Sequence, residues 1–281
     1  MGKTKKLALI VSGGGMKCSY GAGSMTALVE EYGLTKPDIL ICGSGSAGTG
    51  TYYVGEHYQA IKDVWTDLLS SKEMIKGKWF PQLNIDFLVD EIFKKKFPFD
   101  KNKVRDSKTT YFIPVLNREN GSQKYFSNKE DVDLYEVMRA TKSLPIFSKL
   151  DPKIKINDSY YCDSLLTSGT KTHFKKAVEE GASKILIINN SPEELKNNTM
   201  VLAFNLWIRY QGFGENYYSL EKNLLKYNMP ETIKIMEIKP KENLTISTLT
   251  NNKDELTKTF NQGYKETLKN KKLEKFLEGF T

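Results

Sequence analysis

The chain has 281 residues, 39% hydrophobic and 11% aromatic, which is enough apolar material for a sizeable core and argues against a disordered protein. The formal net charge of +8 comes almost entirely from scattered lysines, since only four residues are arginine. This pattern argues against the concentrated, arginine-rich surface of a nucleic-acid-binding protein. It leaves attraction to an anionic membrane open.

Three cysteines, an odd number, argue against a disulfide framework and for a reducing compartment. The basic first residues precede the apolar run Leu7–Val11, which is too short for the hydrophobic part of a signal peptide. No apolar stretch approaches the length of a membrane span. We therefore expect a cytoplasmic protein, with peripheral membrane contact as an open addition.

The N-terminal part alternates apolar runs with segments of helical spacing, and a glycine-rich turn follows each apolar run. The expected order is strand, helix, strand, helix, at Leu7–Val11, 21–31, Asp38–Cys42 and Tyr53–Leu69. Such a β-α-β-α order predicts a parallel sheet covered by helices on both faces.

The rest of the chain adds shorter strands and a helical end. The expected elements are a strand pair at Thr109–Asn117 and Lys124–Ser127, a helix at Asp133–Lys142, a strand at Lys184–Asn189 preceded by a helix through Val178, a strand near Thr232–Ile238 and a terminal helix at Asp254–Phe280. The predicted fold class is α/β, with a mostly parallel central sheet. We expect one domain over 1–281, with a core at about 5–190 and a mainly helical extension at about 191–281.

The stretch Gly43–Gly48 (GSGSAG) satisfies the dinucleotide pattern GxGxxG after a strand. The acidic residue expected about twenty positions later, at the end of another strand, is missing, because Asp63 and Asp67 lie in a helical segment. A Walker motif is absent as well, since no Gly-Lys-Ser/Thr follows Gly13-Gly14-Gly15. A Rossmann-type nucleotide-binding protein remains the weaker alternative.

The same stretch fits a serine nucleophile on a sharp strand-to-helix turn, where the neighbours two residues away must be small. Around Ser46 the elbow would be Ser44, Gly45, Ala47 and Gly48, that is S-G-S-A-G. The expected base is Asp163, at the end of a short aromatic strand. A carboxyl group with an ordinary pKa of about 4 becomes a usable base when it is buried. Asp163 acting as a helix cap is an equally open interpretation.

A third group of residues lies between the first strand and its helix, at Gly13, Gly14, Gly15, Met16 and Lys17. Successive glycines leave main-chain N–H groups uncovered at a helix N-terminus, where they can stabilise an oxyanion. The two histidines, His57 and His173, are placed poorly for a Ser-His-Asp triad.

In this order, GGGMK, S-G-S-A-G and the Asp163 loop resemble the motifs of the patatin-like phospholipase family. The segment from Ala140 to Pro145 and the NQGY stretch ending at Tyr264 resemble further parts of that family, so the resemblance covers nearly the whole chain. Cys18, Ser44 and the Ser164-Leu165 pair stand where the family has glycine or alanine.

The resemblance implies a three-layer fold and a Ser-Asp dyad. In it Ser46 forms an acyl-enzyme, Asp163 moves the protons, and the N–H groups of Gly14, Gly15 and Met16 hold the oxyanion. It implies lipid acyl hydrolysis, of phospholipase A or related esterase type, with no metal and no cofactor. A degenerate member that binds lipid or membrane without turnover is the main alternative.

Two further expectations concern the surroundings of this site. The aromatic segment Trp207–Tyr218 would be a lid or acyl-chain contact, or else core packing. All three cysteines, Cys18, Cys42 and Cys162, stand beside the motifs, so a thiol reagent that reached them would impair activity.

Overall fold

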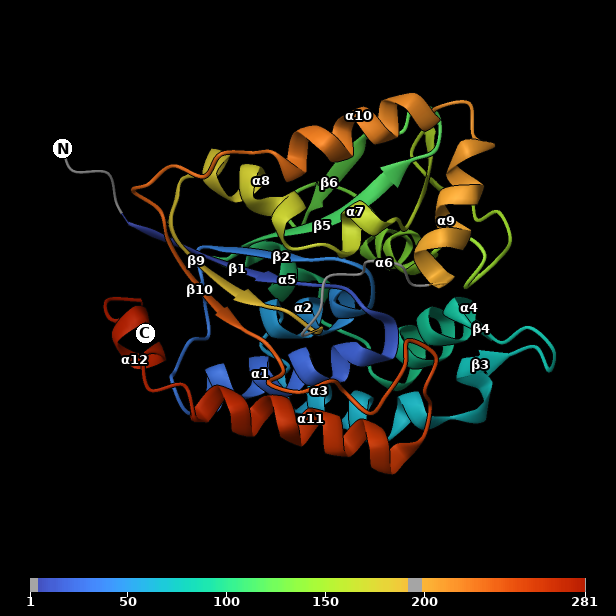
Figure 1. Ribbon diagram of the computed structural model, residues 1–281. Helices are drawn as coiled ribbons and strands as arrows, with labels where there is room; N and C mark the ends of the chain where they lie inside the picture. Colours follow the sequence, from blue (N-terminus) through green and yellow to red (C-terminus); the bar gives the residue numbers. More distant parts are fainter. Residues whose placement is uncertain (1–4, 192–198, 281) are drawn as a thin grey trace.

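A mixed sheet of eight strands forms the middle of the protein in the computed structural model, which describes residues 5–191 and 199–280 (Figure 1). The strands follow the order β10-β9-β1-β2-β5-β8-β7, and β6 pairs with β5 beside this path. Their bounds are β1 Lys6–Val11, β2 Ile39–Cys42, β5 Thr110–Asn117, β6 Gln123–Ser127, β7 Ile154–Ile156, β8 Ser159–Cys162, β9 Ala182–Ile188 and β10 Lys234–Ile238. From β10 to β5 all neighbours are parallel, which confirms the predicted α/β class.

Helices cover both faces of this sheet. Figure 1 shows α1, α3 and α11 below it and α8 and α10 above it. The helices are α1 Cys18–Glu30, α2 Ala47–Val54, α3 Tyr58–Thr66, α4 Ile85–Phe87, α5 Lys101–Asp106, α6 Leu134–Lys142, α7 Leu165–Ser168, α8 Phe174–Glu179, α9 Thr199–Arg209, α10 Gly214–Leu225, α11 Lys253–Leu268 and α12 Leu273–Leu277. No helix of the described residues is long and apolar enough to cross a lipid bilayer.

The central strands are apolar at every position because both of their faces are buried. Along β1, Leu7 and Leu9 belong to the core under α1 and α3, whereas Ala8 and Ile10 belong to the core on the opposite face. This alternation follows the two-residue period of a strand.

Several bounds differ from the sequence predictions. The single helix expected at Tyr53–Leu69 is wrong: α2 ends at Val54 and α3 begins at Tyr58, because Glu56 takes a left-handed backbone with φ of 57°. The expected terminal helix is also divided, between α11 and α12. A small hairpin, β3 Ile75–Lys76 with β4 Gln82–Leu83, and the π-helical segment Leu88–Lys96 that continues α4 were not predicted.

The segment expected as a lid or as core packing is largely core. Trp207, Phe213 and Tyr217 are buried together with Phe204 of α9. Tyr210, between them, is exposed.

The C-terminal part is joined to the rest through the sheet and through a close helix crossing. β10 extends the parallel sheet beside β9. α11 crosses α1 so closely that a Cβ added to Gly263 would lie 2.0 Å from the carbonyl oxygen of Tyr20, and one added to Gly23 would lie 1.9 Å from that of Phe260. On these contacts we propose that the chain folds as a single domain.

Candidate active site

The predicted motif segments meet in one cleft at the ends of the strands. Its empty volume is about 2250 Å³, part of it open to solvent. The walls come from the glycine loop after β1, the turn after β2, the end of α6 and the loops after β8 and β9, with Gly14, Ser44, Lys142, Asp163 and Asn190 among the lining residues. The glycine loop, the serine turn and the Asp163 loop, which the sequence analysis singled out, are therefore neighbours in space.

Ser44 has the strained backbone that a nucleophile elbow requires. Its φ is 51°, one of four positive values among the described residues other than glycine. Its side chain lines the cleft, and a Cβ added to Gly13 would lie 2.8 Å from its Cβ. Its hydroxyl also helps to stabilise the charged form of Asp163. Ser44 thus lies between the glycine loop and the predicted base.

Ser46, the predicted nucleophile, has a different environment. Its backbone is helical, with φ of −77° and ψ of −14°. The hydroxyl donates a hydrogen bond of 2.6 Å to the carbonyl oxygen of Ser12 and accepts one of 3.3 Å from Nδ2 of Asn190. The residue is buried and lines neither the cleft nor the apolar pocket described below.

Asp163 lies directly after β8 and is fully buried. Its Oδ1 accepts hydrogen bonds from the main-chain N–H of Ser164, at 2.7 Å, and from the Thr167 hydroxyl. Its Oδ2 forms no hydrogen bond of acceptable geometry in the described structure, although the Ser44 hydroxyl is near enough to lower the pKa of Asp163. Burial raises the pKa of Asp163 to about 7, although the hydroxyls of Ser44 and Thr167 oppose the rise.

Asp163 is not itself the cap of the following helix. Ser164 caps α7: its hydroxyl accepts from the N–H of Thr167, whose hydroxyl accepts in turn from the N–H of Ser164. Asp163 supports this turn through Oδ1 only. Its other carboxylate oxygen, Oδ2, forms no hydrogen bond, and Asp163 is one of the residues that line the cleft.

Lys142, at the end of α6, was not predicted as a site residue. It is buried, lines the cleft, and its Nζ donates hydrogen bonds to the carbonyl oxygens of Ser44, at 2.8 Å, and Gly45, at 3.0 Å. Desolvation lowers the pKa of Lys142 to about 8, and the charges of Cys18 and Asp163 oppose that change. The preceding residue, Thr141, accepts from the N–H of Ser44 at 3.0 Å. The end of α6 therefore holds the elbow on both sides of Ser44.

The glycine loop presents two main-chain amides without partners. Gly13 donates to the carbonyl oxygen of Ser168 at 2.9 Å, and Met16 donates to that of Thr248 at 3.1 Å. Gly14 and Gly15 have no acceptor for their N–H groups in the part of the chain that the structure describes. Both have positive φ, 138° and 57°, which favours glycine. Lys17 completes this loop and also lines the cleft.

The histidines lie away from both serines' hydroxyls. His173 is buried behind the site, where its Nδ1 is 2.9 Å from the Tyr125 hydroxyl, and burial lowers its pKa to about 4. His57 is exposed at the start of α3. Neither forms a hydrogen bond with Ser44 or Ser46 in the described structure.

A second, apolar pocket opens beside the elbow, with an empty volume of about 550 Å³ that includes open solvent. It lies between the elbow, α3 and the π-helical segment, and is lined among others by Ser44, Ile61, Trp65, Leu88, Phe93 and Lys142. Ser44 and Lys142 line both the pocket and the cleft. The described residues contain no cluster of three His, Cys, Asp or Glu side chains that could hold a metal ion.

The sequence model of the patatin-like phospholipase family matches residues 9–173, which is more than half of the chain and includes the glycine loop, the serine turn, Lys142 and Asp163. The chain belongs to this family. The patatin-like region is followed by a match to a domain of unknown function, DUF6363, at residues 215–278. The family is one of lipid acyl hydrolases, as the sequence motifs predicted.

The patatin-like chain also resembles VipD from Legionella pneumophila, with a TM-score of 0.52 and 12% sequence identity. The likeness covers 94% of this chain but 66% of VipD, and at this identity it concerns the fold alone. No curated protein matches the sequence.

The sequence contains a weak pattern that would place Ser44, and not Ser46, at the centre of a nucleophile elbow. Cys42-Gly-Ser44-Gly-Ser46 also places small residues two positions before and after a serine. Two overlapping patterns therefore compete within seven residues, and S-G-S-A-G has the family's final glycine. Lys142 carries no sequence signal, because its burial depends on the packing of α6 against the elbow.

Proposed function

We propose that this protein is a lipid carboxyl-ester hydrolase that works through an acyl-enzyme, with Ser44 as nucleophile in place of the predicted Ser46. Asp163 is the general base and acid, and the N–H groups of Gly14 and Gly15 hold the oxyanion. The observation that carries the proposal is the position of Ser44: a strained serine in the cleft, with a buried carboxyl on one side and unpartnered amides on the other.

In the first half-reaction, Oγ of Ser44 attacks the ester carbonyl carbon and its proton moves to Oδ2 of Asp163. The carbonyl oxygen becomes an oxyanion, stabilised by the two amides. When the tetrahedral intermediate collapses, the bond to the alcohol breaks and Asp163 gives its proton to the leaving oxygen. The acyl group remains on Ser44.

In the second half-reaction, Asp163 takes a proton from water as the water oxygen attacks the acyl carbon. Collapse of this intermediate releases the acid, and the proton returns to Ser44. A base with a pKa of about 7 suits this work at neutral pH, because it is ionised in part yet still accepts a proton readily.

The apolar pocket supports a lipid substrate. It begins at Ser44, and its walls are apolar side chains such as Trp65, Leu88 and Phe93, which are the chemistry that an acyl chain would contact. The cleft on the other side of Ser44 is more polar and would receive the alcohol part of the ester. The assignment of acyl and alcohol sides is part of the proposal.

The test compares Ser44→Ala, Ser46→Ala and Asp163→Asn with wild type, each checked for folding by circular dichroism. Hydrolysis of p-nitrophenyl butyrate and labelling by a fluorophosphonate probe are measured. We expect Ser44→Ala to lose both labelling and turnover, Asp163→Asn to lose turnover, and Ser46→Ala to keep both.

Labelling lost in Ser46→Ala and kept in Ser44→Ala would return the nucleophile to Ser46. A folded wild type with neither labelling nor turnover would sink the hydrolase proposal and favour the lipid-binding alternative. Tandem mass spectrometry of the labelled peptide, with fragment ions that separate Ser44 from Ser46, gives an independent assignment.

A further inference from the structure

The β3–β4 hairpin carries two aromatic side chains that are largely exposed to solvent. It projects from the body on the right of Figure 1. At its tip, Trp79 is 93% exposed and Phe80 is 57% exposed. Gly77, with φ of 88°, makes the turn so tight that a Cβ there would lie 2.4 Å from the carbonyl oxygen of Phe80. The two rings are therefore presented by a defined turn.

The base of this hairpin is fixed to the body. Leu83 donates through its N–H to the carbonyl oxygen of Phe147 at 2.9 Å, and Gln82 donates through Nε2 to that of Ile146 at 2.7 Å. Met74 and Leu83, at the two ends of the hairpin, line the apolar pocket. The exposed tip and the wall of the pocket are thus parts of one short segment.

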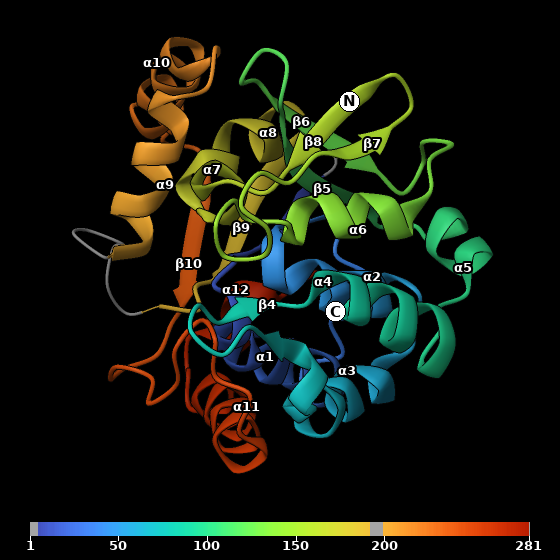
Figure 2. The ribbon, with the colours of Figure 1, turned by 90° about the vertical axis from the view of Figure 1, so that its right-hand side faces the viewer.

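Helix α9 presents a second apolar surface on the same side of the molecule. Figure 2 is viewed from that side, with α9 at its left. Leu202 and Leu206 are exposed and four residues apart, which places them on one face of the helix, and the exposed Tyr210 follows directly after its last residue. The opposite face carries Phe204 and Ile208, which are buried in the core. The helix is therefore apolar on a side that faces solvent.

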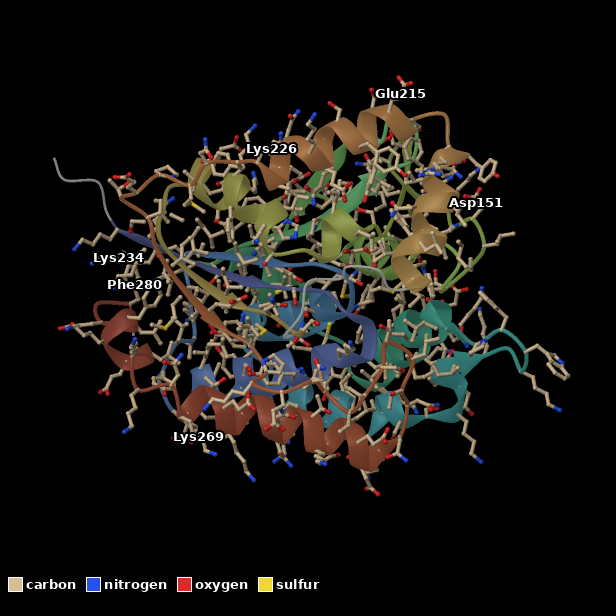
Figure 3. The ribbon with its side chains drawn as sticks, in the orientation of Figure 1. Asp151, Glu215, Lys226, Lys234, Lys269 and Phe280 are labelled. Atoms are coloured by element: carbon tan, nitrogen blue, oxygen red, sulfur yellow. The ribbon has the colours of Figure 1, made fainter. Side chains whose placement is uncertain are left out.

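The charges around these side chains are mainly positive, with Glu73 as an acidic exception before β3. Lys76 and Lys78 flank the hairpin tip, and Arg209 ends α9; all three are exposed and form no ion pair among the described residues. Asp151, which lies beside α9 in Figure 3, is paired with Arg118 at 2.8 Å. The surface thus combines apolar side chains with uncompensated basic ones.

We propose that the hairpin tip and the exposed face of α9 dock onto an anionic lipid bilayer and hold the pocket against it. Aromatic rings settle at the boundary of headgroups and acyl chains, while lysine and arginine pair with anionic headgroups. An ester entering the pocket would then pass Met74 and Leu83 directly from the membrane. The purpose of the docking rests on the proposed function, but vesicle binding can be measured whether or not the protein is a hydrolase.

The experiment is co-sedimentation of the full chain with vesicles of equal parts phosphatidylcholine and phosphatidylglycerol, and with vesicles of phosphatidylcholine alone. The variants are Trp79→Ser with Phe80→Ser, Leu206→Ser with Tyr210→Ser, and Lys76→Gln with Lys78→Gln. The matched control is Leu268→Ser, an exposed leucine next to Lys269, which lies at the opposite end of the molecule in Figure 3.

We expect wild type to prefer the anionic vesicles and to lose binding at high salt. The aromatic pair variant should bind roughly tenfold or more weakly, since each buried ring favours the apolar phase. The α9 variant should also bind more weakly, the lysine variant should lose the preference for phosphatidylglycerol, and Leu268→Ser should match wild type. Turnover of the soluble p-nitrophenyl ester should not change in any of them.

Unaltered vesicle binding by the aromatic pair variant would overturn the proposal. So would a wild type that hydrolyses the soluble ester but binds no vesicles, which would leave the proposed function intact. A wild type that binds the vesicles but does not hydrolyse the soluble ester would contradict the proposed function and leave the docking proposal intact. A second copy of the chain would be the occupant of this surface under a different set of results. Wild type would then sediment as a dimer, the variant with Trp79→Ser and Phe80→Ser would sediment as a monomer, and vesicle binding would be the same in both.

Discussion

Lys142 and Ser44 are joined by a hydrogen bond of 2.8 Å between the ammonium of one and the main-chain carbonyl oxygen of the other, across 98 positions of sequence. A backbone with positive φ at a residue other than glycine persists only where its surroundings hold it. Here Thr141 accepts from the N–H of Ser44 and Lys142 donates to its C=O. Two consecutive residues of α6 thus hold the strained residue by both of its polar main-chain groups.

The first prediction concerns the pH dependence of Lys142→Met. Wild-type activity should rise as Asp163 loses its proton around a pKa of about 7, and fall as Lys142 loses its own around a pKa of about 8. Without the ammonium the alkaline fall should disappear. The acidic rise should move to higher pH, because the charge that lowers the pKa of Asp163 is gone. We expect kcat to fall by about a hundredfold, with KM little changed.

The measurement is a kcat and KM profile against pH, with Lys149→Met as the exposed control. A Lys142→Met enzyme that keeps the bell-shaped profile would refute this role. A role of Lys142 that does not depend on its charge would lower activity equally at every pH.

The second prediction is that Asp163→Asn stabilises the protein at high pH. The pKa of Asp163 is raised in the folded state, so its favourable contribution is complete at low pH and is lost as pH rises through about 7. Asparagine keeps an oxygen for the N–H of Ser164 and carries no charge. The gain in free energy of unfolding over wild type should therefore grow by up to about 4 kcal/mol between roughly pH 4 and pH 8.

Urea unfolding at several pH values checks this, with the exposed Asp158→Asn as the control that should show no trend. A stability difference that stays constant with pH would contradict the raised pKa of Asp163.

Much of the fold could be predicted because its central strands are continuous apolar runs. β1, β2, β5 and β9 each read as buried strands from their residues alone. The β3–β4 hairpin could not be predicted, since strands of two residues carry no periodic pattern and are held by bonds to the 146–147 loop. The break before α3 did carry a signal, since Gly55 is the C-cap of α2 and directly precedes Glu56.

The site could be predicted to the level of its loops and no further. The glycine loop, the serine turn and Asp163 do line one cleft. The proposed assignment of Ser44 over Ser46 rests on the positive φ of Ser44, whose main-chain groups are bonded to Thr141 and Lys142 far along the chain. The free amides of the glycine loop likewise depend on which carbonyl groups of distant segments reach it.

The third prediction is that the cysteines do not react in the folded protein. Cys18, Cys42 and Cys162 are all buried. Desolvation raises the pKa of Cys18 to about 11 and that of the other two as well, so little reactive thiolate forms. The sequence-based expectation that a thiol reagent impairs activity has the condition that the reagent reaches these thiols, and all three are buried.

A chromogenic disulfide reagent should therefore titrate no thiol in native protein and all three cysteines in guanidinium chloride. Rapid labelling of native protein at Cys18, accompanied by loss of turnover, would show that the site opens in solution.

The fourth prediction tests the crossing of α1 and α11. At Gly263 an added Cβ would meet the Tyr20 carbonyl oxygen at 2.0 Å, so Gly263→Ala must push the helices apart. Overpacking of this kind should cost about 3 kcal/mol of unfolding free energy, measured in urea. Gly212→Ala is the matched control, because nothing lies within 4 Å of a Cβ at that position.

α1 begins at Cys18, directly after the glycine loop, so its displacement should also move the amides of Gly14 and Gly15. Turnover by the folded Gly263→Ala protein should then fall, while Gly212→Ala keeps both stability and turnover. Full stability in Gly263→Ala would mean that the two helices separate without cost and do not fix the loop.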